Sequence, residues 1–124
     1  MAGLTFDTGA LVGLERNHQR IRRIFAVAVR DNVQITVPAA VLTEWWRART
    51  DLAEQILAAV DVEPLDEELA KIAGEALAAI KRATTIDAVV MASAARRGDV
   101  VYTSDFDDLS RLQTQFPGVR ILRC

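Results

Sequence analysis

Four acidic residues stand where their carboxylates could act on one substrate. They are Asp7, Glu44, Asp87 and Asp105. Carboxylates in a group suit phosphodiester hydrolysis, in which negative charge builds on a centre that already repels hydroxide. A hard dication held by carboxylates can neutralise a phosphate oxygen and lower the pKa of an attacking water. Because no thiolate or imidazole stands near these acids in the sequence, oxygen ligands would favour Mg²⁺ or Mn²⁺ over zinc.

Each of these acids also has a plainer explanation. Asp7 and Asp105 precede helix-like segments, and aspartate is a preferred helix cap. Asp87 lies in the first turn of a helix-like segment, where the helix dipole favours an acid by roughly 0.3–1 kcal/mol. Glu44 lies at the edge of an apolar stripe, where a solvated glutamate is the alternative. The catalytic interpretation therefore depends on all four acids meeting at one place.

The elements that would bring them together alternate along the chain. Strands are predicted at 4–6, 34–37, 62–65, 100–103 and 119–122. Helices are predicted from Thr8, around 21–29 with Val29 on the apolar stripe, and from a first turn that contains Pro38 to Ala48. Further helices are predicted at 51–59, at 67–80 with Asp66 as the cap, at 86–97 with Gly98 as the end, and at 107–115. This alternation predicts a single domain over residues 1–124 of the α/β class, with three layers: a central parallel sheet of four or five strands and helices on both faces. Ligands of such sheets bind beyond the carboxyl ends of the strands, where the strand order reverses.

Four short segments carry a family pattern in the expected order. They are FDTGAL at 6–11, TE at 43–44, IDAVVMA at 86–92 and TSDFDDL at 103–109. Together they resemble the PIN-domain family, and the chain length is similar to that of VapC toxins from bacterial toxin–antitoxin pairs. The resemblance implies a PIN-like fold whose catalytic and metal-binding residues are the four acids. It also implies an auxiliary role for Asp108, as a further ligand or a general base, and a polar residue beside the site, Ser104.

The same resemblance implies a function and partners. The chain would be a Mg²⁺- or Mn²⁺-dependent endoribonuclease that cleaves RNA by in-line attack of metal-activated water, leaving a 5′-phosphate and a 3′-hydroxyl. A cognate VapB-like antitoxin would inhibit it, and it would form a homodimer in the cytoplasm. Relatives often carry another acid just before the third motif, where this chain has Thr84 and Thr85. Whether one or two metal ions act therefore stays open.

Charge is unevenly distributed along the chain. Residues 1–50 carry seven Arg against four acids, residues 51–80 carry eight acids against one Lys, and residues 81–124 carry seven basic residues against five acids. Arginine suits bidentate phosphate contacts, although a compositional bias would also explain its abundance. The arginines predicted to contact RNA are Arg20, Arg23, Arg47, Arg49, Arg96 and Arg97. The acidic segment 51–80 is expected to face away from the RNA.

Other interpretations stay open at this point. Trp45 and Trp46 fit core packing or a dimer interface better than base stacking. Phosphotransfer through Asp7 would call for a second acid two residues later, where Gly9 stands. A catalytically silent interaction module would have no need to keep four acids. The sequence offers no signal peptide and no apolar run that could span a bilayer, so we expect no membrane association.

Overall fold

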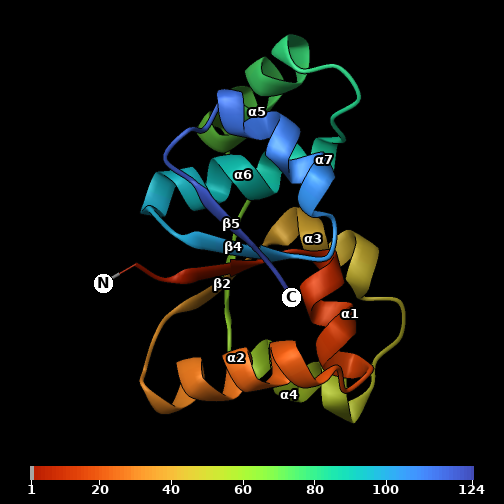
Figure 1. The fold of residues 1–124 in the computed structure, drawn as a ribbon. Coiled ribbons are helices and arrows are strands. Elements are labelled where there is room, and N and C mark those ends of the chain that lie inside the picture. Colours follow the sequence, from red (N-terminus) through yellow and green to blue (C-terminus); the bar gives the residue numbers. More distant parts are fainter. Residues whose placement is uncertain (1) are drawn as a thin grey trace.

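The structure, a computed structural model, describes residues 2–124 and confirms the predicted three-layer α/β architecture (Figure 1). Within this range five parallel strands form one sheet in the order β3-β2-β1-β4-β5. The strands are β1 (Leu4–Phe6), β2 (Ile35–Pro38), β3 (Asp61–Glu63), β4 (Val100–Thr103) and β5 (Arg120–Arg123). The helices are α1 (Thr8–Glu15), α2 (Gln19–Arg30), α3 (Ala39–Trp45), α4 (Asp51–Ala58), α5 (Glu67–Ala79), α6 (Thr85–Arg97), α7 (Phe106–Ser110) and the 3-10 turn η1 (Arg111–Thr114). Helices α1, α2 and α4 lie on one side of the sheet and α5, α6 and α7 on the other (Figure 1).

The strand order reverses between β1 and β4. The chain runs outward from β1 through β2 to β3, and then returns to the other side of β1 as β4. Register pairs Phe6 with Tyr102, so the two strands end almost level. Since parallel strands end at the same edge, the residues that follow β1 and β4 lie at one switch point of the sheet, where ligands of this fold class bind.

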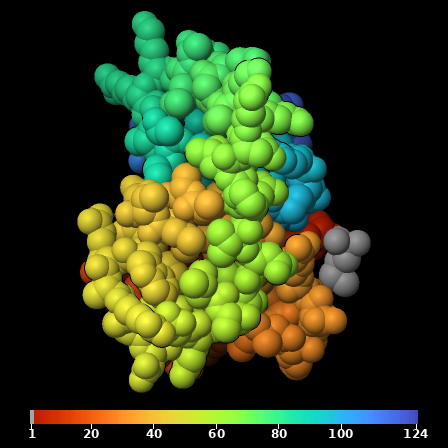
Figure 2. Space-filling view, turned by 180° about the vertical axis from the view of Figure 1, so that it is seen from behind, coloured from red at the N-terminus to blue at the C-terminus, as the bar shows by residue number. Residues whose placement is uncertain are grey.

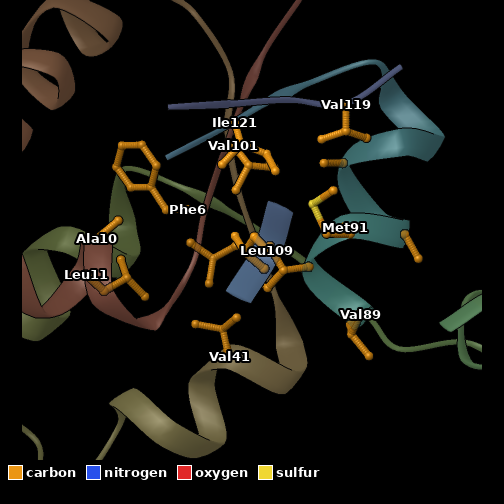
Figure 3. Close-up of a cluster of buried hydrophobic side chains, with 14 of the residues drawn as sticks. Phe6, Ala10, Leu11, Val41, Val89, Met91, Val101, Leu109, Val119 and Ile121 are labelled. Atoms are coloured by element: carbon orange, nitrogen blue, oxygen red, sulfur yellow. The ribbon is translucent and has the colours of Figure 1, made fainter. Parts of the chain in front are cut away.

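The core holds the short helix α7 in place at that edge. Leu109 of α7 is fully buried. Figure 3 shows it at the centre of a cluster that includes Met91 of α6, Val101 of β4 and Val41 of α3. Burying such a side chain stabilises the fold by roughly 1.5–3 kcal/mol. The turn after β4 is therefore positioned by the hydrophobic core, although it faces solvent.

The ends of several predicted helices were wrong. Helix α3 stops at Trp45 instead of continuing to Ala48. Trp45 is 5 % exposed, its ring meets that of Trp46 edge-on at 5.7 Å, and its Nε1 donates to Glu15 Oε1 at 2.5 Å. Packing of this indole, rather than helical periodicity, sets the end of the helix. Val29, predicted to lie on the buried stripe of α2, is 51 % exposed.

Several capping predictions are confirmed, while other boundaries shift. As predicted, Asp66 caps α5 with its side chain and Gly98 ends α6 with a positive φ of 72°. Thr84, which was not predicted as a cap, caps α6 with its hydroxyl oxygen. Pro38, predicted in the first turn of a helix, is the last residue of β2 and precedes α3. The strand predicted at 62–65 lies at 61–63, and the helix predicted at 107–115 is α7 followed by η1.

The acidic segment 51–80 covers much of one side of the molecule. Figure 2 shows this side, where α4, β3 and α5 run from yellow to green. Strand β3 is an edge strand whose exposed Asp61 and half-buried Glu63 oppose pairing with another sheet. No helix within residues 2–124 has the length and apolar character needed to cross a bilayer.

Candidate acidic active site

Asp7 is a helix cap whose carboxylate is almost fully buried. It precedes α1, and its Oδ1 accepts a hydrogen bond from the backbone N of Ala10 at 2.9 Å. Its Oδ2 accepts a 2.5 Å hydrogen bond from the Thr103 hydroxyl at the end of β4. Burial raises the pKa of Asp7 from 3.8 to about 6, in spite of these two donors, and the charges of Asp105 and Asp87 raise it further. Capping a helix does not by itself require that the carboxylate be buried at this cost in free energy.

Thr103 connects the two aspartates at the switch point. Its hydroxyl donates to Asp7, and its Oγ1 accepts from the backbone N of Asp105 at 2.8 Å. Thr103 is fully buried, whereas Asp105 is exposed. In the sequence, Thr103 stands out only as the first residue of the fourth motif. Thr103 lies two positions after buried Val101, so its side chain is on the same face of the strand. This alternation could have predicted that its hydroxyl points toward the buried carboxylate of Asp7.

Asp87 approaches the same place from the other side of the sheet. Thr84 accepts a hydrogen bond from the backbone N of Asp87 at 3.2 Å, which fixes the first turn of α6. Partial burial raises the pKa of Asp87, and the charges of Asp105, Asp108 and Glu44 raise it further. These acids therefore act on one another electrostatically, as expected for carboxylates gathered at one edge.

Glu44 and Asp108 are held by neighbouring side chains at the rim of this group. Thr8 donates to Glu44 Oε1 at 2.6 Å, which joins α1 to α3. Arg111 Nη1 donates to Asp108 Oδ1 at 2.7 Å. Asp107 points to solvent, with 87 % of its side chain exposed. The structure thus brings Asp108, and not Asp107, beside the predicted acids.

The donor chemistry at this edge fits a hard dication. All the candidate ligands are carboxylates, and several raise one another's pKa, so a cation there would relieve their repulsion. The side chains do not yet surround one position, because no group of three or more potential ligands within residues 2–124 is arranged to hold a metal ion. The oxygens of Asp7 already accept protein hydrogen bonds.

The predicted RNA-contacting arginines fall into two groups. Arg20 and Arg23 line a cavity of about 680 Å³ with Tyr102 and Leu122. Arg47 lines a cavity that it shares with Glu44. These three arginines lie on the side of the sheet that carries α1 and α2, or at the acidic edge.

The remaining three arginines are committed to acids elsewhere. Arg49 pairs with Glu54 at 3.2 Å and Arg96 with Asp66 at 3.0 Å. Arg97 binds both Glu63 and Asp99, and only 18 % of its side chain is exposed. Ten residues of α6 separate Arg97 from Asp87, or roughly 15 Å along the axis. The ion pairs of Arg96 and Arg97, and the distance of this end of α6 from Asp87, count against these two arginines as RNA contacts.

A cavity opens directly beside the acids, and we call it the site cavity. It has a volume of about 410 Å³, and Glu44, Ser104 and Asp105 line one part of its wall. Arg16 and His18 also line it. Arg16 was not predicted. It lies two turns after Thr8, and this spacing along one face of α1 was the signal that could have found it.

Gly9 allows the close approach between α1 and the turn after β4. A Cβ at Gly9 would lie 2.8 Å from Ser104 Cβ and 1.9 Å from Ser104 Oγ. Rotation of the Ser104 hydroxyl cannot relieve the contact with Ser104 Cβ, so the Ser104–Asp105 turn would have to move. We expect Gly9→Ala to lower the free energy of unfolding by about 1–3 kcal/mol.

Gly74→Ala is the matched control, because a Cβ at this position in α5 would meet nothing within 4 Å. It should raise the free energy of unfolding by about 0.5–1 kcal/mol through helix propensity. Urea denaturation of the two variants measures both values. An equal change in the free energy of unfolding for the two variants would contradict the close approach of Gly9 to Ser104.

Comparisons with known proteins agree with this geometry. The PIN domain family model matches residues 4–114. The crystal structure of DNA-bound VapBC from Salmonella typhimurium is similar, with a TM-score of 0.74 and 20% identity over 99% of this chain and 98% of that chain. VapBC2 from Rickettsia felis, bound to a promoter DNA fragment, gives a TM-score of 0.77 with 11% identity over 98% of each chain. FitAB bound to a DNA fragment gives a TM-score of 0.66 with 17% identity over 97% of this chain and 94% of that chain. No curated protein sequence matches the chain.

Proposed function

Because this chain belongs to the PIN-domain family, we propose that it is a metal-dependent endoribonuclease, a toxin of the VapC type. The observation that carries the proposal is the meeting of Asp7 and Asp105 at the switch point, with Asp87 close enough to raise the pKa of Asp7. Structures of toxin–antitoxin complexes with the same fold support the toxin class. A catalytically silent module remains the alternative that the experiment below must exclude.

In this proposal Asp7, Asp87, Asp105 and Glu44 hold Mg²⁺ or Mn²⁺. The bound cation supplies charge neutralisation at the phosphate and a lowered pKa for the attacking water. Thr103 fixes the orientation of Asp7 through the hydrogen bond to Oδ2. Since its pKa is raised to about 6, Asp7 must give up its proton before it can serve as an anionic ligand.

One residue just before the third motif and one residue of the fourth motif have narrower roles. Thr84, which stands where relatives often carry an acid, uses its hydroxyl oxygen to cap α6 and so supports Asp87. Asp108 is proposed as an auxiliary ligand or general base, and its hydrogen bond from Arg111 holds the carboxylate at the rim. The proposal therefore uses one set of ligands, the four acids.

The test compares two exposed aspartates two residues apart. RNA cleavage by the wild type should require Mg²⁺ or Mn²⁺ and stop with EDTA. Asp105→Asn should abolish cleavage because it removes a proposed ligand, whereas Asp107→Asn should cleave as the wild type does, since Asp107 points to solvent. A gel assay on structured tRNA and mRNA measures all three proteins. Metal-independent cleavage, or equal activity of the two variants, would refute the site, and no cleavage by the wild type would favour the silent module.

The proposed partners are RNA, a VapB-like antitoxin and a second copy of the chain. An apolar cavity of about 420 Å³, lined by Leu4, Ile24 and Val27, adjoins the cavity of Arg20 and Arg23. An amphipathic antitoxin helix fits such a groove in the usual helix-in-groove mode. Exposed Val27 and Val29 on α2 support a homodimer, which light scattering of the isolated protein measures.

A further inference from the structure

A second cavity adjoins the site cavity. Its volume is about 380 Å³, and Trp45 and Arg47 contribute to its wall. Val12, Arg16 and Glu44 line both cavities. The two hollows therefore meet along a ridge formed by one apolar, one cationic and one anionic side chain. Asp105 lines the site cavity on one side of this ridge, and Trp45 lines the second cavity on the other side.

The guanidinium of Arg16 is available to an anionic ligand at this ridge. The residue is exposed at the end of α1, and no ion pair within residues 2–124 involves it. Glu44, the acid that shares both cavities with it, accepts its hydrogen bond from Thr8 instead. An unpaired arginine that faces concave space suits bidentate binding of a phosphate.

The position of Arg16 along α1 indicates which phosphate it meets. Asp7 and Arg16 lie at opposite ends of this eight-residue helix, which is roughly 12 Å long. A strand whose scissile phosphate lies at the acids therefore presents a nearby phosphate of the same strand to Arg16. The two cavities on either side of the ridge leave room for the nucleosides that this phosphate joins.

We propose that Arg16 binds an RNA phosphate near the scissile one on the same strand, between two nucleotides that enter the site cavity and the second cavity. Arg16 thereby holds the strand in register with the acids and takes no part in the bond-breaking step. The proposal rests on the proposed ribonuclease function.

The test measures RNA binding separately from cleavage. Fluorescence anisotropy in EDTA follows a short fluorescein-labelled RNA without secondary structure over a range of salt concentrations. Arg16→Ala should weaken binding about tenfold and reduce the slope of log K against log salt by about 0.7–1. Arg16→Lys should keep the slope, because the charge remains. Arg120→Ala is the matched control, since Arg120 is exposed and pairs in register with Val100 at the start of β4, away from the acids.

Cleavage kinetics and melting curves complete the comparison. Arg16→Ala should raise KM about tenfold with kcat nearly unchanged, and it should melt like the wild type because the side chain is exposed. A salt slope for Arg16→Ala equal to that of the wild type would overturn this inference while leaving the ribonuclease function intact. A wild type that neither binds nor cleaves RNA would overturn both.

Discussion

Asp7→Asn is expected to lower RNA cleavage by more than about 100-fold and, at the same time, to stabilise the metal-free protein at neutral pH. Cleavage falls because the substitution removes a proposed ligand, and even the loss of a residue that only supports a metal ligand costs about 10–100-fold. Stability rises because asparagine carries no charge that has to be buried. Its Oδ1 can still accept the hydrogen bond that Asp7 accepts from Ala10, but its Nδ2 cannot accept the one that Asp7 Oδ2 accepts from Thr103, which offsets part of the gain.

The stability gain should depend on pH. The pKa of Asp7 is about 6 in the folded protein, against 3.8 for an ordinary aspartate. Because the folded pKa is the higher one, the protonated carboxyl favours the fold. Its contribution is fully present below pH 3.8 and is lost as the pH rises to about 6. A shift of about two pKa units corresponds to about 3 kcal/mol. After the loss of the Thr103 hydrogen bond, the variant should exceed the wild type by about 1–3 kcal/mol well above pH 6 and should have no advantage below pH 4.

Urea denaturation in EDTA across this pH range measures the difference, and Asp105→Asn is the control. Replacing Asp105 should also abolish cleavage, because it removes a proposed ligand. Since Asp105 is exposed, its replacement should not give the pH-dependent gain in stability. Addition of Mg²⁺ should stabilise the wild type and leave Asp7→Asn almost unchanged. An Asp7→Asn protein that is less stable than the wild type at neutral pH would mean that its carboxylate contributes to folding as an anion.

Arg97→Ala is expected to lower the free energy of unfolding by about 3 kcal/mol. Nη1 of this guanidinium donates to Glu63 at 2.5 Å, Nε to Asp99 at 2.9 Å and Nη2 to the Thr5 hydroxyl at 2.9 Å. Asp99 is 5 % exposed, and Glu63 is largely covered. Removing the arginine leaves the carboxylates of Glu63 and Asp99 without their cation, and breaking a buried pair in this way typically costs 3–5 kcal/mol.

Arg96→Ala is the neighbouring control for this prediction. Arg96 also binds a carboxylate, that of Asp66, but the pair is solvated, so its loss should change the free energy of unfolding far less than the loss of Arg97. Urea denaturation compares the two variants, and RNA binding by either should keep the salt slope of the wild type. A stable Arg97→Ala protein with a reduced salt slope would restore Arg97 as an RNA contact and contradict the structural role.

The acidic site was more predictable than its surroundings because of where its residues fall in the sequence. Asp7 and Asp105 follow apolar strands, and the general rule for parallel sheets places such residues at a ligand-binding edge. Thr103 could not be assigned in the same way, because its role depends on the register between β1 and β4, which places its hydroxyl beside Asp7. Arg16 and Arg97 look alike in sequence, and only tertiary packing separates the arginine on a cavity wall from the one in a buried network.

Helix ends were predicted well where they depend on local chemistry and poorly where they depend on packing. The cap Asp66 acts within three residues of itself, so the sequence contains the whole interaction. The end of α3 depends instead on an indole that reaches Glu15, thirty positions earlier. Val29 follows the apolar period of α2, yet no element covers that side of the helix within the described residues.

The position of β1 in the sheet also governs when the acids can meet during synthesis on the ribosome. Strand β1 is made first, but one of its two neighbours, β4, begins only at Val100. The Thr103–Asp7 hydrogen bond spans 96 positions, so it forms late and only after most of the chain has emerged. A nascent chain that ends before β4 lacks Asp105 and the hydroxyl that orients Asp7. Under the proposed function, the nuclease therefore stays incomplete until the segment through Asp105 has been translated.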